Sequence, residues 1–342
     1  MKTIRLLLLS LLVSAAAMGQ EKAPRIAAEL KYNGNGEFKI LQITDTHVIA
    51  GDPRSERTLQ NLNAVLDAEK PDFVIHTGDI VFGAPAKQSA RLVLQTIADR
   101  GIPFAVALGN HDSDFDLTRA DIYEVVRSVA GNVNTPADPC LSGCSNDILT
   151  LSGRNGLERV FYLFDSGNRD YPADIKSWGY VHADQIQWYR NASDYFKKAN
   201  GGKPVPSFAF FHIPVPEYRE ALHDSSKKAR FLRGNIGEEP AVPIFNSGLY
   251  TAMREQGDVQ AIATGHDHNN DFVLYWQGFF FIYGRYSGCD TVYNDLKPNG
   301  ARVFLFTEGE PGFRTWVRLS DGRVEQDLKL RPGMKGLSPQ AE

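Results

Sequence analysis

Short apolar segments alternate with amphipathic segments through the first third of the chain. Three apolar runs have the length of β-strands, and each ends at polar residues: 38–43, 73–75 and 104–108. Two stretches between them repeat apolar positions at helical spacing. The first begins at Asp52-Pro53, a favourable N-cap and first helical residue, and the second runs from about Lys87 to a stop at Gly101. The order strand, helix, strand, helix, strand predicts a parallel sheet with right-handed crossovers.

The rest of the chain shows the same two patterns without a break in composition. Residues 183–200 have helical spacing, and residues 272–276 and 279–283 flank a Gln-Gly pair, as in a β-hairpin. Residues 131–156 are rich in Gly, Asn, Pro and Ser, and we expect an irregular surface insertion there. Further strands are expected at 160–164, 207–211, 260–263, 303–306 and 314–319.

The N-terminal residues have the pattern of a secretory signal peptide. Residues 1–20 begin with Lys2 and Arg5, continue as an apolar run, and end in small residues. The apolar run is too short to span about 30 Å of membrane hydrocarbon, and no later segment is long enough. We therefore expect an exported protein, periplasmic or extracellular, with no membrane span. The remainder would form one domain over residues 21–335 and a loose tail over residues 336–342.

Composition and charge narrow the choice of partners. The chain has 342 residues, 42% hydrophobic and 23% charged, and a formal net charge of −4. This is an ordinary globular composition without a basic footprint, so we expect no nucleic-acid partner. Cys140 and Cys144 lie close together in a chain expected to be exported, and the sequence leaves open whether they form a disulfide. A disulfide between them would leave Cys289 as an unpaired thiol. The sequence does not indicate an oligomeric state.

Five polar clusters follow five of the predicted strands and carry the candidate chemistry. The carboxyl ends of parallel strands meet at one edge of a sheet, so these clusters should converge there. Their oxygen and imidazole ligands, without thiolate, suit Zn, Mn or Fe. They are too many for one ion, and two ions about 3.5–4 Å apart are typical of displacement at phosphorus. The clusters are Asp45-Thr46-His47, Gly78-Asp79, Gly109-Asn110-His111-Asp112, Phe211-His212 and Gly265-His266-Asp267-His268.

The order of the clusters carries more weight than any one of them. A lone Gly-Asp or a lone His212 is more often a loop turn or a buried histidine than a ligand, whereas five clusters in order, each after a strand, favour one site. Two divalent ions with only two ligand carboxylates stay positively charged, which favours a phosphoryl group. We expect His76 to be a packed strand-end residue, and His182 and His223 to lie on the surface.

The five clusters together resemble the calcineurin-like metallophosphoesterase superfamily. Residues 38–42, 210–217 and 265–270 look like the branch of plant "probable inactive purple acid phosphatases" and related fungal phosphatases. The resemblance implies an α/β fold, a four-layer α/β/β/α sandwich of two mixed sheets with a dinuclear metal site at the strand C-terminal edge. It assigns two ligand sets that share Asp79: Asp45, His47, Asp79 and His268 for the first metal, and Asp79, Asn110, His212 and His266 for the second.

The resemblance also implies roles for the residues around the metals. It makes His111 the proton donor and a phosphate contact, with Asp112 orienting it, and Asn110 a further substrate contact. Phe82 departs from purple acid phosphatases, which have a tyrosine there, so we expect a colourless site holding Mn, Zn or Fe. Arg285 follows a predicted strand between two glycines. It could grip a phosphate oxygen, or it could be a surface arginine paired with a carboxylate such as Asp290.

The preferred interpretation is an exported phosphoesterase acting on a small-molecule phosphate ester, with monoesters favoured. In this interpretation a hydroxide bridging two metal ions attacks phosphorus in line, while His111 assists the leaving oxygen. A phosphodiesterase or nucleotide hydrolase is the alternative within the enzyme class. A non-catalytic metal-binding scaffold protein is the alternative from another class. The complete set of expected ligands favours an enzyme.

Overall fold

The computed structural model describes residues 23–169 and 175–333. The predicted signal peptide, residues 1–20, and the predicted tail, residues 336–342, lie outside the described residues. Within the described ranges, none of the helices combines the length and the apolar character needed to cross a bilayer. Cys140, Cys144 and Cys289 are free thiols, so the structure does not contain the disulfide that the sequence left open.

One sheet has six strands in the order β14-β13-β12-β2-β3-β4. Its parallel half is the predicted one, because β2, β3 and β4 pair in parallel, whereas β12, β13 and β14 add antiparallel strands. The strands are β2 (Glu37–Ile43), β3 (Phe73–His76), β4 (Phe104–Val106), β12 (Gly300–Thr307), β13 (Phe313–Leu319) and β14 (Val324–Leu330).

The other sheet has eight strands in the order β1-β5-β6-β7-β9-β11-β10-β8. Strands β6, β7, β9 and β11 are parallel neighbours, and β10 and β11 form the predicted antiparallel hairpin. The expected insertion at residues 131–156 is only partly irregular. Its second half contains β5, because Ile148, Leu149 and Leu151 are buried between neighbouring layers. The strands are β1 (Ala28–Lys31), β5 (Asp147–Gly153), β6 (Gly156–Leu163), β7 (Ser207–Phe210), β8 (Arg230–Arg233), β9 (Val259–Thr264), β10 (Val273–Trp276) and β11 (Phe279–Tyr283).

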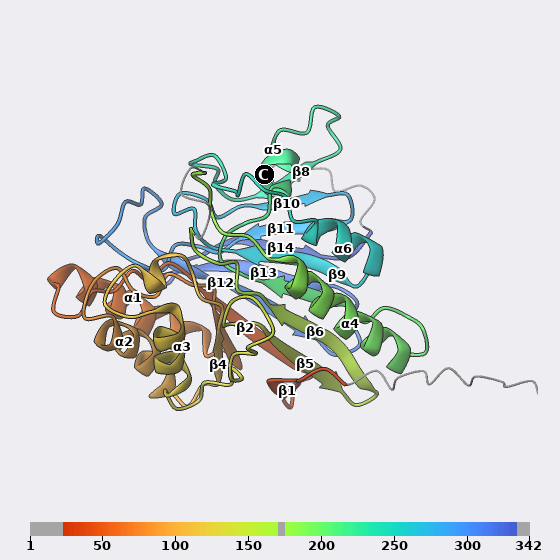
Figure 1. The fold of residues 1–342 in the computed structure, drawn as a ribbon, viewed down its shortest axis with the longest axis horizontal. Helices are drawn as coiled ribbons and strands as arrows, with labels where there is room; N and C mark the ends of the chain where they lie inside the picture. Colours follow the sequence, from red (N-terminus) through yellow and green to blue (C-terminus); the bar gives the residue numbers. More distant parts are fainter. Residues whose placement is uncertain (1–22, 170–174, 334–342) are drawn as a thin grey trace, which may run out of the picture.

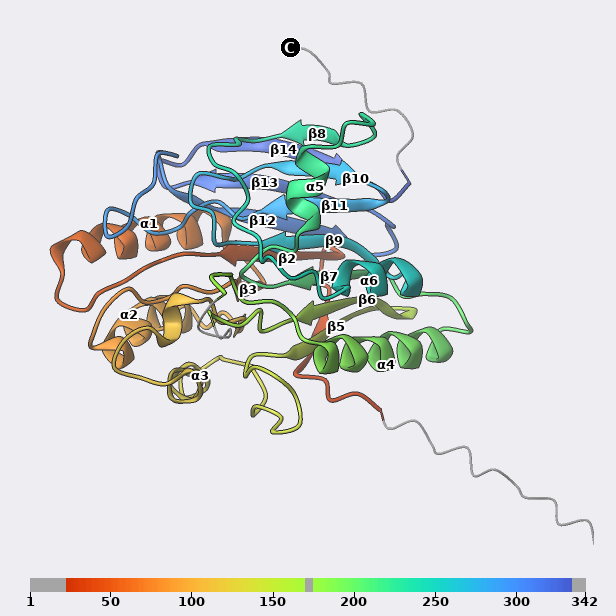
Figure 2. The same ribbon diagram turned by 45° about the horizontal axis from the view of Figure 1, so that its top comes forward.

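Helices cover the outer face of each sheet, which confirms the four-layer α/β/β/α arrangement of two mixed sheets. Helices α1 (Pro53–Glu69), α2 (Ala86–Ala98) and α3 (Arg119–Arg127) pack on the six-stranded sheet. Helices α4 (Ala183–Ala199), α5 (Glu217–Leu222) and α6 (Leu249–Gln256) pack on the eight-stranded sheet. In Figures 1 and 2 the strands lie between α1–α3 on one side and α4 and α6 on the other.

The space between the two sheets is an apolar core rich in phenylalanine. Phe161, Phe208 and Phe304 are fully buried there, and burying each such side chain contributes about 1.5–3 kcal/mol. Polar contacts join the two sheets, and one of them lies near the carboxyl end of β2. Gln42 Nε2 on β2 donates to the carbonyl oxygen of Thr264, at the end of β9, at 3.0 Å. The carboxyl ends of strands from both sheets are therefore held side by side, and this edge carries the polar clusters.

Candidate metal centre

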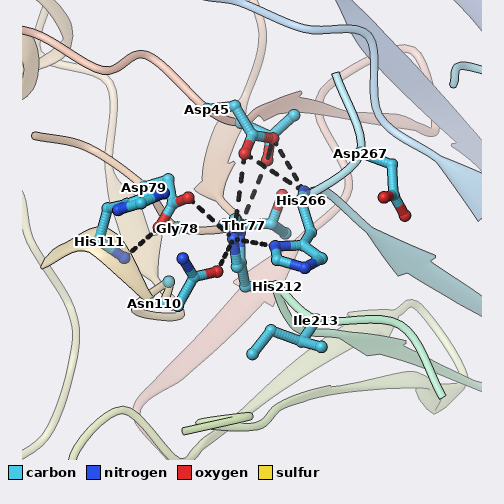
Figure 3. Close-up of polar contacts among 12 residues, drawn as sticks. Asp45, Thr77, Gly78, Asp79, Asn110, His111, His212, Ile213, His266 and Asp267 are labelled. Atoms are coloured by element: carbon cyan, nitrogen blue, oxygen red, sulfur yellow. Dashed lines mark hydrogen bonds and ion pairs between the residues drawn. The ribbon is translucent and has the colours of Figure 1, made fainter. Parts of the chain in front are cut away.

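The five predicted clusters converge at this shared edge. Two come from the eight-stranded sheet and three from the six-stranded sheet, and each follows the carboxyl end of a strand. All predicted ligand side chains are at most 7% exposed. Figure 3 shows His212 in the middle of the group, with contacts to its neighbours drawn as dashed lines. The ligands follow β2 (Asp45, His47), β3 (Asp79), β4 (Asn110), β7 (His212) and β9 (His266, His268).

His212 is surrounded by the rest of the second predicted ligand set. Its Nε2 lies 3.1 Å from Asp79 Oδ2 and 3.1 Å from Asn110 Oδ1. The Nδ1 of His266 lies 3.3 Å from the same nitrogen. These four side chains, which the resemblance assigns to one ion, therefore present ligand atoms to one small volume.

The first predicted ligand set also meets Asp79. His47 Nε2 lies 3.3 Å from Asp79 Oδ2, and His268 Nε2 lies 3.7 Å from Asp45 Oδ1. Asp45, His47 and His268 could together hold one metal ion, and Asp79, His212 and His266 another. One oxygen of Asp79 faces both His47 and His212, which is the position that a shared carboxylate requires.

The hydrogen bonds behind the histidines fix which nitrogen faces the centre. His212 Nδ1 donates to the carbonyl oxygen of Thr77 at 2.7 Å, and His268 Nδ1 donates to that of Tyr293 at 2.9 Å. Carbonyl oxygens only accept, so both Nδ1 atoms carry hydrogen and both Nε2 atoms face inward. Such backbone partners are typical behind metal-binding histidines, where they hold the ring in place.

The atoms that face the centre favour a cation between them. Because Nδ1 donates a hydrogen bond to the carbonyl oxygen of Thr77, the Nε2 atom of a neutral His212 can only accept. It faces oxygens of Asp79 and Asn110 that are themselves acceptors. Burial alone would lower the pKa of His212, but the carboxylates of Asp79 and Asp45 raise it to about 9. The surrounding atoms therefore favour positive charge at this nitrogen, and the donor set fits metal ions of borderline hardness.

The other three ligand histidines are neutral imidazoles. Burial lowers the pKa of His47 and His266, and it lowers the pKa of His268 to about 3. Neutral imidazole is the form that binds metals. His266 Nε2 is buried without a hydrogen-bond partner in the described part of the chain, and its ring contacts the Trp178 ring with 4.4 Å between centroids.

Backbone strain is concentrated in this site. Residues with a side chain rarely adopt a positive φ, and doing so costs about 1–3 kcal/mol each. Half of the non-glycine residues with positive φ in the described ranges are predicted ligands, so the surrounding contacts force the backbone to aim their side chains inward. These ligands are Asp45 (φ 54°), His47 (φ 48°), Asp79 (φ 55°) and His266 (φ 79°).

The glycines of the clusters allow the loops to touch. A Cβ on Gly265 would lie 1.9 Å from Thr44 Oγ1, and a Cβ on Gly78 would lie 2.4 Å from the Gly109 nitrogen. Real Cβ atoms do not approach other atoms this closely, so any side chain at these positions would push the loops apart. The Gly residues that made the clusters recognisable are therefore required by loop packing rather than by chemistry.

His111 is more exposed than the predicted ligands, and the carboxylate that contacts it is not the predicted one. Its Nδ1 lies 2.7 Å from Asp114 Oδ2, and 21% of its side chain is exposed. Asp112 does not orient it. The Asp112 carboxylate instead accepts hydrogen bonds from backbone N–H groups, including that of Gly109 at 2.8 Å and that of Ile80 at 2.7 Å. Asp112 therefore joins two loops, and Asp114 is the orienting carboxylate that sequence reasoning missed.

Arg285 does not lie where either interpretation placed it. It is 2% exposed, its Nη1 donates to Asp271 Oδ2 at 2.5 Å, and its Nη2 donates to the carbonyl oxygen of Pro298 at 2.7 Å. Asp290 pairs with Arg57 instead. A buried arginine paired with Asp271 supports the fold, and none of these contacts supports the predicted phosphate clamp.

Aromatic rings surround the ligands. Phe82 lies edge-on to His47 and His111, with centroids 5.2 Å and 4.9 Å away, so an apolar ring occupies the position of the missing tyrosine. Tyr293 is 57% exposed and its ring lies 4.5 Å from that of His268. Neither Tyr293 nor Trp178 carried a sequence signal, because both come from loops without a periodic pattern.

The three spare histidines lie where they were expected. His76 is buried at the end of β3, where its Nδ1 accepts from the Gly78 nitrogen at 3.1 Å. His182 and His223 are exposed.

Comparisons with known proteins identify the family of the chain. A family model described as "Calcineurin-like phosphoesterase" matches residues 38–270. "Probable inactive purple acid phosphatase 29" of Arabidopsis thaliana is 29% identical, over 92% of this chain and 91% of that protein. "Phosphatase DCR2" of Saccharomyces cerevisiae is 29% identical, over 92% of this chain and 59% of that protein. Both agree with the branch that the sequence resembles.

A solved structure supports the fold. A dimetal phosphatase from Danio rerio superposes with a TM-score of 0.59 at 12% identity, over 86% of this chain and 98% of that one. At this identity the likeness concerns the fold alone. The family match covers more than half of the chain and spans all five polar clusters. The chain therefore belongs to the calcineurin-like phosphoesterase family.

Proposed function

We propose that this protein is an exported dinuclear metal-dependent phosphoesterase, with small-molecule phosphate monoesters as its favoured substrates. One observation carries the proposal. Two sets of buried ligand atoms meet at Asp79, and a partly exposed histidine with its own carboxylate partner stands beside them. Family membership supports the same class of chemistry.

The proposed ligand sets are those that the resemblance implies. Asp45, His47, Asp79 and His268 would hold one ion, and Asp79, Asn110, His212 and His266 would hold the other. Mn, Zn and Fe suit this mixture of imidazole, carboxylate and amide donors. When bound, two such ions would polarise the phosphoryl group and supply a water-derived nucleophile at neutral pH.

His111 has the position and the partner of a proton donor. Its Nδ1 hydrogen is held by Asp114, so its Nε2 is the atom that can carry a proton to a leaving oxygen. The backbone N–H of His111 donates to Asp79 Oδ1 at 2.7 Å, which ties this residue to the shared carboxylate. General acid help of this kind is typically worth about 10²–10⁴-fold in rate.

Two alternatives remain open to experiment. The plant relative carries the words "probable inactive" in its name, which favours a metal-binding scaffold without turnover. The yeast relative is named a phosphatase, and here all the proposed ligands and His111 are in place. Within the enzyme class, phosphodiesters or nucleotides are the alternative substrates. Export to the periplasm or the outside of the cell is proposed from the sequence of residues 1–20.

A panel of esters tests the proposal. The purified protein would be stripped with a chelator, reconstituted with Mn, Zn or Fe, and assayed with p-nitrophenyl phosphate and bis(p-nitrophenyl) phosphate. We expect hydrolysis that requires metal and is faster with the monoester. Hydrolysis of neither ester by protein that holds two ions per chain would favour the scaffold, and faster diester hydrolysis would favour the phosphodiesterase.

A further inference from the structure

Arg169 lies next to the predicted metal centre, on the segment that follows β6. Its Nη1 lies 3.2 Å from Asp114 Oδ2, the oxygen that also contacts His111 Nδ1 at 2.7 Å. Its Cζ lies 4.9 Å from the centroid of the Trp178 ring, and that ring contacts the ring of His266 at 4.4 Å. One guanidinium therefore contacts the neighbours of two site residues, His111 and His266.

Buried contacts hold the segment that carries Arg169. Asp165, at the start of this segment, pairs with Arg119, and Arg119 Nη1 also donates to the carbonyl oxygen of Gly109 at 2.7 Å. Because Gly109 begins the loop with Asn110 and His111, this ion pair ties the two loops together. A Cβ on Gly179 would lie 2.3 Å from the backbone oxygen of Ser166, so Gly179 also packs tightly against the segment that carries Arg169.

The guanidinium is fixed in place and still accessible. Asp114 takes one of its five N–H donors, and 45% of the side chain is exposed. Stacking on the flat face of Trp178 restricts the rotation of the guanidinium without using a donor. The remaining donors can therefore meet a ligand at little cost in side-chain entropy.

A second donor without an acceptor lies at the same place. Asn110 Nδ2 is buried and has no hydrogen-bond partner in the described part of the chain. A buried donor of this kind is costly unless a ligand accepts from it. Asn110 precedes His111, whose partner Asp114 also contacts Arg169, so the unpaired amide and the guanidinium both neighbour His111.

We propose that Arg169 is a specificity residue that binds the terminal oxygens of a phosphate monoester. The proposal rests on the proposed phosphoesterase function. A monoester near neutral pH carries three terminal oxygens and close to two negative charges, whereas a diester carries two terminal oxygens and one charge. A guanidinium can grip two terminal oxygens of either ester, but its positive charge attracts the dianion of a monoester more strongly than the monoanion of a diester, so it favours the monoester.

The test compares Arg169→Gln and Arg169→Lys with a matched control in full-length, metal-loaded protein. The control is Arg323→Gln, a surface arginine in the turn between β13 and β14, paired with Asp321 and with 58% of its side chain exposed. Binding of inorganic phosphate is measured by isothermal titration calorimetry, which does not depend on turnover. Initial rates with p-nitrophenyl phosphate and bis(p-nitrophenyl) phosphate give kcat and KM for each ester.

Arg169→Gln should weaken phosphate binding and raise KM for the monoester by about 10- to 100-fold, the range of a lost charge-assisted contact. Arg169→Lys should lose less, because it keeps the charge but not the fork. KM for the diester should change by less than about twofold on this charge argument. Bound metal should stay unchanged, and Arg323→Gln should match the wild type.

Three results separate this inference from the proposed function. Unchanged phosphate binding in Arg169→Gln would overturn the inference, whether or not the protein hydrolyses esters. Equal losses for monoester and diester would also overturn it, because they indicate a general disturbance of the site. Weaker phosphate binding in Arg169→Gln, with no hydrolysis of any ester by the wild type, would support the role of Arg169 and refute the proposed function.

Discussion

Replacing Asp112 by Asn separates a structural role of this carboxylate from a catalytic one. Asp112 is 1% exposed and accepts four backbone N–H groups. Its Oδ1 faces Ile80 (2.7 Å) and Val81 (3.3 Å), and its Oδ2 faces Gly109 (2.8 Å) and Asp79 (3.1 Å). The carboxylate therefore joins the turn after β3 to the loop after β4. An asparagine keeps one acceptor oxygen and turns an NH₂ group towards the other two N–H groups.

The magnitude follows from these contacts. A buried polar group left without a partner costs about 1–3 kcal/mol, so two N–H groups facing an amide would cost about 2–6 kcal/mol. Burial and the nearby charge of Asp79 raise the pKa of Asp112, so removing the Asp112 charge relieves part of that repulsion. We therefore expect the free energy of unfolding to fall by about 3 kcal/mol, measured by urea unfolding in the presence of a chelator.

Asp114→Asn is the matched control, because it makes the same change two residues away. The Asp114 side chain is 24% exposed, so the free energy of unfolding should change by less than about 0.5 kcal/mol. Turnover should fall by at least about tenfold, because His111 loses the carboxylate that orients it. KM for a monoester should rise as well, because Asp114 also pairs with Arg169. Wild-type stability in Asp112→Asn would refute the structural role. A selective loss of turnover in that variant, with unchanged stability, would restore Asp112 as the residue that orients His111.

Four further variants test the other roles. Asp79→Asn or Asn110→Ala should abolish activity and lower bound metal, because each removes a ligand atom from the centre, and two ions per chain in Asp79→Asn by metal analysis would contradict this. His111→Ala should keep both ions and lose about 10²–10⁴-fold in turnover, and a loss below about tenfold with a poor leaving group would show that it is not the donor. Arg285→Met should leave phosphate inhibition unchanged. It should destabilise the protein by about 3–5 kcal/mol, because Asp271 stays buried without its partner. Weaker phosphate inhibition at unchanged stability would support the phosphate clamp instead.

The sequence predicts the central strands and the ligand clusters well, because both depend on local patterns. Buried parallel strands are continuous apolar runs, and the loops after β2, β3 and β4 carry their polar residues directly at the strand ends. Predicted caps also hold: Asp52 accepts from the Arg54 nitrogen at 2.9 Å at the start of α1. Edge strands were missed, because β1 has only four residues and β14 contains the polar run 325–327.

The partners of the site residues could not be predicted in the same way. Asp112 and Asp114 both lie within three residues of His111, and only the short 3₁₀ turn at His111–Ser113 decides which carboxylate meets the ring. The pairing of Arg285 with Asp271 joins a loop to the end of a distant turn, and no local pattern reports it. Arg169 and Trp178 likewise meet only because the fold brings the parts of the chain that carry them together.

The most direct test of the central claim is the rate of monoester hydrolysis as a function of metal ions bound per chain. Stripped protein would be titrated with Mn or Zn, with bound metal measured by mass spectrometry on the same samples that are assayed with p-nitrophenyl phosphate. Because Asp79 faces both ligand sets, we predict that the protein binds two ions and that turnover rises as the second ion is bound. Hydrolysis at the full rate in metal-free protein, or none with two ions bound, would contradict a dinuclear phosphoesterase.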